Sequence, residues 1–285
     1  MDMKNSVPLV SVIIPTYNHA ALLEKALQSV AAQTFQDWEA IVIDNQSTDR
    51  TKDVVESMRD PRIRYVAFSN RGVIAASRNL GIRMAAGSVI AFLDSDDLWY
   101  PTKLSVCVEF IEHGADAVCH GLWIRKDGFL DTKLSPKPTS RNCYGTLLYQ
   151  GNTMIATSAV MIKKQCFDRY GVFSEDPLLV TAEDYELWLR LSKHTVRWGF
   201  MPEVLGEYTV HGENASGNVQ KQMLAEERIV MKYFKEIQNP TIYEQVSYRK
   251  RRMMMVFRAG KRVWQSGNHC ASLPYFGNGL FKLFG

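Results

Sequence analysis

The sequence predicts an α/β protein with a mostly parallel sheet flanked by helices, followed by a C-terminal helical extension. Two observations predict the sheet: short apolar segments alternate with segments of helical period, and polar residues follow three of the apolar segments. Two long stretches of helical period after residue 219 predict the extension. With 285 residues, of which 46% are hydrophobic and 22% charged, the chain can bury a large core.

The first third of the chain alternates expected strands and helices. Residues 89–93 form a continuous apolar run, which is typical of a strand buried on both faces of a parallel sheet, and residues 9–14 predict a first buried strand that ends at Pro15. The strands expected here are residues 9–14, 38–43, 63–67 and 89–93. The helices expected between them are residues 20–33, 51–58 and 72–85. This spacing predicts parallel strands joined by helical crossovers.

After Asp97 the regular alternation fades. Residues 126–141 contain glycine, two prolines and mixed charges, and they predict an exposed loop or an irregular hairpin. The strands expected here are residues 115–124, 157–162 and 204–210, and the helices are residues 101–112, a segment that begins at Glu183, 219–237 and 242–264. We therefore divide the chain into residues 1–97, 98–218 and the helical extension 219–285.

Polar residues follow three expected strands at the point where each strand ends: Pro15-Thr16, Asp44-Asn45 and Asp94-Ser95-Asp96. The carboxyl ends of parallel strands lie on one edge of the sheet, where open α/β sheets bind ligands. Asp94 and Asp96 offer hard oxygen ligands for Mg²⁺ or Mn²⁺, with a substrate diphosphate completing the shell. The alternative is an acidic turn that only caps the next helix.

Composition and missing motifs exclude several other classes. Five cysteines with no CxxC pair argue against a disulfide framework and favour a reducing cytosol. The N-terminal apolar run is short and flanked by Pro8 and Pro15, so we expect no signal peptide, and no stretch has the length of a membrane span. Neither GxGxxG after the first strand nor GxxxxGK[ST] is present, which disfavours a dinucleotide-binding or P-loop enzyme.

Six motifs together resemble the family 2 glycosyltransferases over residues 9–216. In chain order they are VIIPTYN (12–18), IDNQSTD (43–49), SRNLG (77–81), FLDSDD (92–97), EDYELW (183–188) and YTVH (208–211). The resemblance implies a GT-A fold, which is Rossmann-like, with residues 1–97 binding the nucleotide sugar and residues 98–218 binding the acceptor and completing the catalytic site. Asn45-Gln46 departs mildly from the Asp-Gly most common there, which weakens any specific assignment of the nucleotide base.

The resemblance also implies an activity of the bacterial surface-glycan type. An inverting, metal-dependent enzyme would move a hexosyl or N-acetylhexosaminyl group from a nucleotide-diphosphate donor, expected to be a UDP-sugar. The acceptor would be a hydroxyl of a glycan or of a polyprenyl-linked oligosaccharide.

Residue roles follow from the same resemblance. The nucleotide would be bound by Pro15, Thr16, Tyr17, Asn18, Asp44, Arg78, Asp94 and Ser95. Asp44 would accept a hydrogen bond from the uracil imide, and Arg78 would reach the nucleotide from the third helix. Asp96 and His211 would hold Mn²⁺ or Mg²⁺. Asp184 would be the catalytic base, with Glu183 beside it as a second catalytic candidate.

The chemistry of sugar transfer needs these residue types. The leaving diphosphate gains charge that a divalent cation at Asp94 and Asp96 would stabilise, and a carboxylate such as Asp184 must take the proton of the acceptor hydroxyl. In-line attack of this kind inverts the anomeric centre. The alternatives are that Glu183 and Asp184 only favour a helix N-terminus, that His211 is structural, and that Arg78 pairs with a surface carboxylate. A nucleotide-sugar-binding protein without turnover is the rival function.

The C-terminal 45 residues are strongly basic. Residues 241–285 hold eight Lys or Arg residues and one acid, Glu244, whereas the rest of the chain is slightly acidic. Apolar residues are interleaved with the cations of residues 249–262, and residues 273–284 are rich in aromatic side chains; together they suit the surface of an anionic membrane. We therefore expect a cytoplasmic protein held at the inner face of the plasma membrane, where a polyprenyl-linked acceptor would lie. Alternatively, residues 242–264 pack on the body or form a homodimer contact; no motif supports nucleic-acid binding.

Overall fold

The computed structural model describes residues 7–126, 128–136, 143–152, 155–194, 196–211, 218–265, 267 and 270–275. The chain forms two compact units. Unit 1 comprises Met1–Pro138, Met154–Phe173 and Leu191–His211, and unit 2 comprises Thr139–Thr153, Ser174–Arg190 and Gly212–Gly285.

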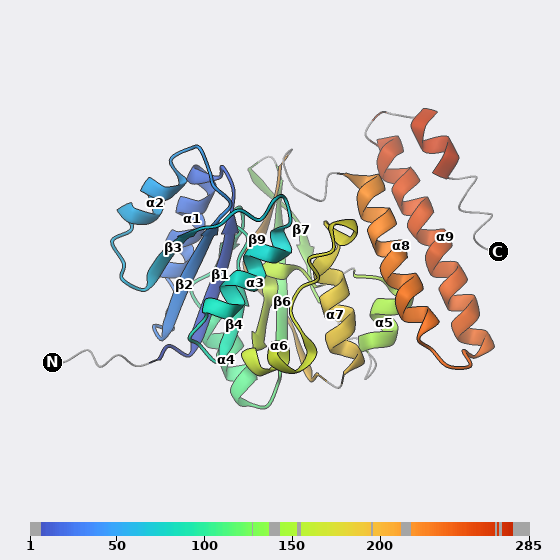
Figure 1. The fold of residues 1–285 in the computed structure, drawn as a ribbon, viewed down its shortest axis with the longest axis horizontal. Coiled ribbons are helices and arrows are strands. Elements are labelled where there is room, and N and C mark those ends of the chain that lie inside the picture. Colours follow the sequence, from blue (N-terminus) through green and yellow to red (C-terminus); the bar gives the residue numbers. More distant parts are fainter. Residues whose placement is uncertain are drawn as a thin grey trace. The chain divides into compact units, whose positions relative to one another are not determined.

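Unit 1 is built on a nine-stranded sheet of order β3-β2-β1-β4-β8-β6-β9-β5, with β7 paired to β6 (Figure 1). The first four strands in this order are mutually parallel. They are β1 (Val10–Thr16), β2 (Trp38–Asp44), β3 (Ile63–Ala67) and β4 (Val89–Phe92). Every residue of β1 is buried, and the polar Ser11 within it donates to Glu39 and accepts from the Gly87 backbone. The predicted α/β class and parallel βαβ units are confirmed.

Three helices cross between these strands. They are α1 (Ala20–Ala31), α2 (Thr51–Ser57) and α3 (Ile74–Met84). Leu23, Leu27 and Val30 of α1 are fully buried, so the predicted apolar face of this helix lies in the core. A Cβ atom at Gly81 of α3 would lie 2.5 Å from a side-chain carbon of Ile13, so glycine lets α3 lie directly on β1.

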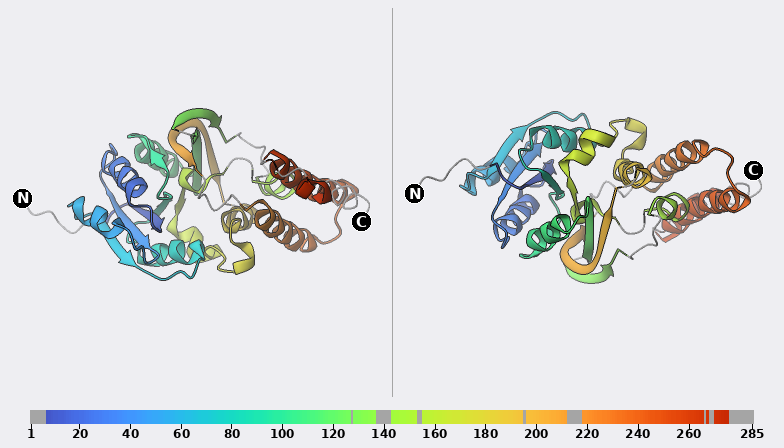
Figure 2. Two further views of the ribbon diagram at one scale, coloured as in Figure 1. Left: turned by 90° about the horizontal axis from the view of Figure 1, so that it is seen from above. Right: turned by 90° about the horizontal axis from the view of Figure 1, so that it is seen from below.

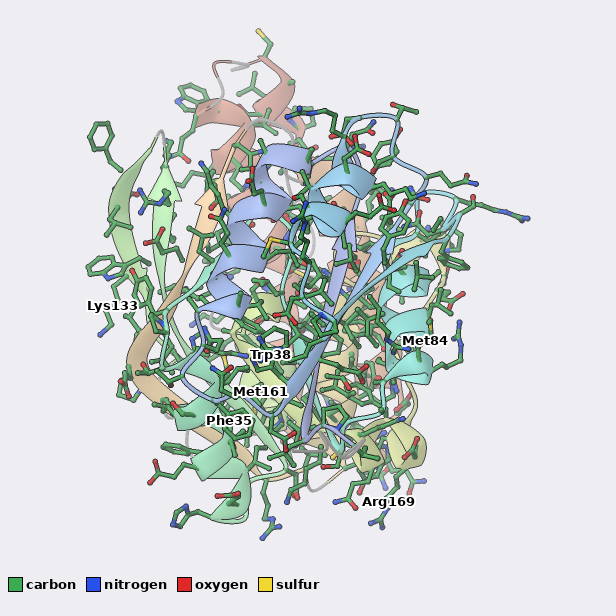
Figure 3. All side chains as sticks on the ribbon, turned by 90° about the vertical axis from the view of Figure 1, so that its left-hand side faces the viewer. Phe35, Trp38, Met84, Lys133, Met161 and Arg169 are labelled. Atoms are coloured by element: carbon green, nitrogen blue, oxygen red, sulfur yellow. The ribbon has the colours of Figure 1, made fainter. Side chains whose placement is uncertain are left out.

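The remaining strands make the sheet mixed. They are β5 (Leu98–Trp99), β6 (Ala117–Lys126), β7 (Phe129–Leu134), β8 (Val160–Lys163) and β9 (Trp198–Val210). Strand β8 pairs antiparallel with β4 and β6, whereas β6 and β9 run parallel. Figure 3 shows Trp38 and Met161, which are buried in this unit, and the exposed side chains of Lys133 and Arg169.

Several predicted boundaries in this half need correction. Within residues 126–141, β7 pairs antiparallel with β6 and the register shifts between Ile124 and Arg125, so the irregular hairpin is the correct alternative for the described residues. Residues 157–159 form a 3₁₀ turn, η1 (Thr157–Ala159), because strand pairing begins only at Val160. Strand β9 starts earlier than expected, at Trp198. Helices α4 (Lys103–Glu112) and α6 (Lys164–Tyr170) complete the unit, and α6 was not predicted.

Unit 2 is helical. Its described elements are α5 (Cys143–Gln150), η2 (Pro177–Leu179), α7 (Glu183–Lys193) as far as Arg190, α8 (Val219–Lys235) and α9 (Ile242–Gln265). The last two confirm the predicted helical extension and lie side by side (Figures 1 and 2). Phe234 stacks on Tyr248 near the connection, and Arg262 donates to Gln222 at the opposite end, so the pair is antiparallel. Residues 276–285, which form the end of the predicted aromatic tail, lie outside the described residues.

A lysine lies in the core of unit 1. Lys103 of α4 is fully buried, and its ammonium nitrogen is 3.5 Å from the centre of the Trp99 ring. Among the described residues the ammonium has no hydrogen-bond partner. Burial lowers the pKa of Lys103 from 10.5 to about 8, although Cys107 and Cys119 nearby act in the opposite direction. The neighbouring His120 is neutral because burial lowers its pKa to about 3.

We predict that Lys103→Met raises the free energy of unfolding at pH 7 by about 1–3 kcal/mol, because a buried charge without an anionic partner is costly. The pKa is lower in the folded state, so the unfolded state binds more protons between pH 8 and 10.5 and wild-type stability rises with pH there. The advantage of the variant should therefore shrink across that window. Urea denaturation at several pH values checks this, with the exposed Lys25→Met as control. A pH-independent difference would contradict it.

Candidate active site

The turn after β4 is organised around a buried carboxylate, that of Asp97. Its Oδ1 accepts a hydrogen bond from the Thr209 backbone at 2.9 Å, and its Oδ2 accepts one from the Ser158 hydroxyl at 2.5 Å. The same hydroxyl accepts from the Asp94 backbone N–H at 3.0 Å. Burial, and then the charges of Asp96 and Asp94, raise the pKa of Asp97 well above its usual value. The turn is thus tied to η1 and to the end of β9.

Asp96 and His211 meet on this turn. The Nε2 atom of His211 lies 2.9 Å from Oδ2 of Asp96. A second imidazole, that of His19, lies 5.7 Å from the ring of His211 and contacts the Ser95 hydroxyl at 3.0 Å through Nδ1. Burial and then the charge of Asp94 raise the pKa of Asp96, and the hydrogen bond with His211 opposes that rise.

Arg78 reaches the same turn from α3. Its guanidinium Nη2 donates to Asp94 Oδ1 at 2.7 Å, and the arginine side chain is 4% exposed. The carboxylate of Asp94 is more open, with 27% of the side chain exposed. Arg78 therefore does pair with a carboxylate, but it is a buried residue at the sheet edge and not a surface one.

Asp44 lies at the end of β2. Its carboxylate is buried and accepts hydrogen bonds from the Tyr65 hydroxyl at 2.6 Å and from the Ser47 backbone at 3.1 Å and hydroxyl at 2.5 Å. Burial and the Asp44 contact raise the pKa of Tyr65 to about 12, so this phenol stays a donor. Thr16 pairs with Asp44 in the parallel register, and its buried hydroxyl has no hydrogen-bond partner among the described residues.

The other nucleotide candidates follow β1. Pro15 is buried in the strand, whereas Tyr17 is 53% exposed. Asn18 has a left-handed backbone (φ 51°), and its Oδ1 accepts from the Thr48 backbone at 2.8 Å. Asn18 thereby joins the loop after β1 to the loop after β2.

Glu183 and Asp184 lie at the N-terminus of α7 in unit 2. The Glu183 side chain is buried, and its Oε2 accepts from the Thr181 backbone at 2.8 Å. Asp184 is half-buried, and its Oδ1 contacts the Tyr185 backbone N–H at 2.6 Å. Both acids lie in the first turn of α7, which is the position that the helix-terminus alternative requires.

The donor atoms of Asp96 and His211 fit a divalent cation of the Mn²⁺ class, since carboxylate oxygen and neutral imidazole are both suitable ligands. Among the described residues no group of three or more His, Cys, Asp or Glu side chains is arranged to hold an ion alone. The remaining ligands would have to come from a substrate, and a diphosphate has the required oxygens.

Three residues of this edge received no role in the sequence analysis: His19, Asp97 and Ser158. Asp97 belongs to the acidic run and His19 follows Asn18, so both had a local signal. Ser158 had none, because only the pairing of β8 with β4 brings η1 to the turn.

Comparisons with known proteins find relatives that match most of the chain. The family model for glycosyl transferase family 2 matches residues 11–171. The Escherichia coli protein UDP-Glc:alpha-D-GlcNAc-diphosphoundecaprenol beta-1,3-glucosyltransferase WfaP is 31% identical over 78% of this chain and 85% of its own length. The Bacillus subtilis protein TuaG, a putative teichuronic acid biosynthesis glycosyltransferase, is 33% identical over 77% of this chain and 86% of its own.

Solved structures share the fold. Staphylococcus aureus TarS 1–349 in complex with UDP-GlcNAc has a TM-score of 0.63 at 19% identity, covering 94% of this chain and 89% of its own. The Pyrobaculum calidifontis mannosyltransferase PcManGT in complex with GDP-Man and Mn²⁺ has a TM-score of 0.65 at 20% identity, covering 95% and 75%. These similarities confirm the GT-A fold.

Proposed function

Because the chain belongs to glycosyl transferase family 2, we propose that it is an inverting enzyme. It would transfer the sugar of a UDP-sugar donor to a hydroxyl of a polyprenyl-linked surface glycan and release UDP. The observation that carries the proposal is the convergence in unit 1 of Thr16, Asp44, Arg78, Asp94 and Asp96 at one edge of the sheet. The name of WfaP describes a UDP-linked donor and a diphosphoundecaprenol acceptor, which supports this donor and acceptor class.

The nucleotide contacts are proposed from unused hydrogen-bonding capacity. A carboxylate offers about four lone-pair sites. Asp44 accepts from the Ser47 backbone and hydroxyl at Oδ1 and from Tyr65 at Oδ2, where the Ser47 backbone also makes a longer contact of 3.3 Å. A uracil imide would donate to Oδ2 in place of that longer contact. The buried Thr16 hydroxyl is a further group for the nucleoside. Arg78 and Asp94 would bind the ribose and diphosphate side, with Pro15, Tyr17, Asn18 and Ser95 shaping the edge around them.

The metal proposal concerns Asp96 and His211. Their Oδ2 and Nε2 atoms would hold Mn²⁺ or Mg²⁺. A bound cation would supply charge stabilisation for the leaving diphosphate. Asp97 and Ser158 keep the turn in place beneath these ligands.

The base proposal concerns Asp184. Its carboxylate would take the proton of the acceptor hydroxyl as that oxygen bonds to the anomeric carbon and the bond to the diphosphate breaks. Glu183 would assist by fixing the start of α7 through Thr181. Attack opposite the leaving group gives inversion.

The membrane proposal concerns one face of α9. Arg251 and Arg252 pair with Glu226 and Glu227 of α8 and are therefore used within unit 2. The exposed side chains of α9 combine cations with apolar groups; they include Ile242, Tyr243, Val246, Arg249, Lys250, Met254, Arg258 and Lys261. Such a mixture suits an anionic lipid surface, where each cation contributes about 1 kcal/mol. None of the described helices has the length and apolar character of a membrane span.

Asp184→Asn tests catalysis. The change keeps the shape of the side chain and removes the base, so we expect kcat to fall roughly 10²–10⁴-fold with donor affinity nearly unchanged. Steady-state transfer assays and calorimetry with UDP measure the two quantities. Transfer within a few-fold of wild type would assign Asp184 to the helix terminus only. A wild-type protein that binds the donor but transfers nothing would favour the rival function, a nucleotide-sugar-binding protein.

Asp96→Ala tests the metal. Removing a hard ligand should abolish the increase in UDP affinity that Mn²⁺ produces, whereas Asp131→Ala on the exposed strand β7 should leave it intact. Calorimetry with Mn²⁺ and with excess chelator measures this increase. Equal wild-type affinity under both conditions would refute the metal role.

Liposome co-sedimentation tests the membrane face. Wild-type protein should bind vesicles that contain anionic lipid, and more weakly at high salt. The double variant Lys250→Gln/Lys261→Gln should bind at least tenfold more weakly, since each exposed cation contributes about 1 kcal/mol. The exposed pair Lys25→Gln/Lys133→Gln is the matched control. Equal binding by both double variants, or a salt-dependent dimer in place of lipid binding, would contradict the proposal.

A further inference from the structure

Helix α7 carries a buried acid two residues after Asp184. Glu186 is 2% exposed and accepts a hydrogen bond from the Tyr233 hydroxyl of α8 at 2.8 Å. Arg190 Nη2 donates to it at 3.0 Å, and Lys232 Nζ approaches to 3.5 Å. Although burial raises it, these partners bring the pKa of Glu186 below its usual value. The ionised form of Glu186 is stabilised by each of these partners, because a buried carboxylate that lacks hydrogen bonds costs folding free energy.

The residue between these two acids is also tied down. The Tyr185 ring is 2% exposed, and its hydroxyl donates to the Leu147 carbonyl of α5 at 2.8 Å. Arg251 of α9 lies beside this phenol and opposes the rise in its pKa that burial causes. The arginine is itself 3% exposed and donates to Glu226 at 2.6 Å.

Arg251 also reaches α5. A Cβ atom at Gly151, where φ is +90°, would lie 2.5 Å from Nη2 of Arg251, so the guanidinium occupies the space that any other residue would need. The basic sequence of α9 therefore includes a cation that is an internal part of unit 2 and cannot face a membrane.

We infer that helices α8 and α9 position the base of the reaction, with Tyr233 holding α7 through Glu186 and Arg251 bracing Tyr185. This inference rests on the proposed role of Asp184. The two residues that follow Asp184 are both fixed in buried contacts, whereas Asp184 is half-buried. Tyr233 and Arg251 are positioning residues: they act on the angle and depth at which α7 presents its first turn. Misplacing a catalytic group by about 1 Å can cost on the order of 10²-fold in rate.

The test compares two identical substitutions. Tyr233→Phe removes only the hydroxyl that Glu186 uses, and Tyr144→Phe makes the same change at a hydroxyl that has no hydrogen-bond partner among the described residues. We expect Tyr233→Phe to lower kcat roughly tenfold or more without changing the affinity for UDP, and Tyr144→Phe to change neither. Glu186→Leu removes the acceptor of this bond together with the ion pairs to Arg190 and Lys232, so it should lower kcat at least as much. The double variant Tyr233→Phe/Glu186→Leu should fall no further than Glu186→Leu alone, because the contact of Tyr233 is then already absent.

Two outcomes would overturn the inference. One is an unchanged kcat in Tyr233→Phe despite a lower unfolding midpoint, which would mean a structural role only. The other is independent, multiplicative losses in the double variant. Hydrogen exchange of the amides of residues 183–190 tests the brace without relying on turnover: it should be faster in Tyr233→Phe and unchanged in Tyr144→Phe. A wild-type protein with no transferase activity would refute the proposed function, while hydrogen exchange would still decide whether Tyr233 holds α7.

Discussion

The edge of the sheet that carries the candidate site depends on the two hydrogen bonds that the buried Asp97 side chain accepts. A strand as apolar as β4 cannot carry its acids into the core unless each buried oxygen finds donors. Asp97 finds them in the Ser158 hydroxyl and the Thr209 backbone, and so joins the ends of three segments that are far apart in sequence. Losing one such partner would cost about 1–3 kcal/mol. With Asp97 turned inward, Asp94 and Asp96 remain at the accessible edge.

The parallel half of unit 1 could be predicted because its strands are recognisable from short sequence segments, without knowledge of long-range contacts. Continuous apolar runs identify strands buried on both faces, and the chain must leave the sheet where Asp44 and Asp94 appear. The site residues on those strand ends therefore follow from the sequence. The contacts of Ser158 and His19 do not, because they exist only after β8 pairs with β4 and β9 returns His211 to the turn. Strand β5 has two residues, too few to show any period.

The sequence of the C-terminal extension shows how many cations it carries but not which of them are exposed. A count of cations treats Arg249, Lys250, Arg251 and Arg252 as one patch. The structure divides them, because successive residues of a helix face different directions. Arg251 is buried against Gly151 and paired with Glu226, whereas Arg249 and Lys250 are exposed. One segment can therefore brace α7 with one face and remain open to a partner with another.

Acidic residues that are neighbours in the sequence differ here in how accessible their carboxyl groups are. Asp97 and Glu186 are almost fully buried, and their oxygens accept hydrogen bonds from neighbouring donors, so these bonds fix the positions of a turn and a helix. Asp94 and Asp184 lie within a few residues of them and keep part of their surface accessible. A ligand can exchange with solvent at an accessible oxygen but cannot displace a buried intramolecular donor without leaving it unpaired. In each pair the buried acid is held by neighbouring donors, and the more accessible acid is the one for which we propose a role with the substrate. Each of these proposed carboxylates therefore has a structural acid within three residues.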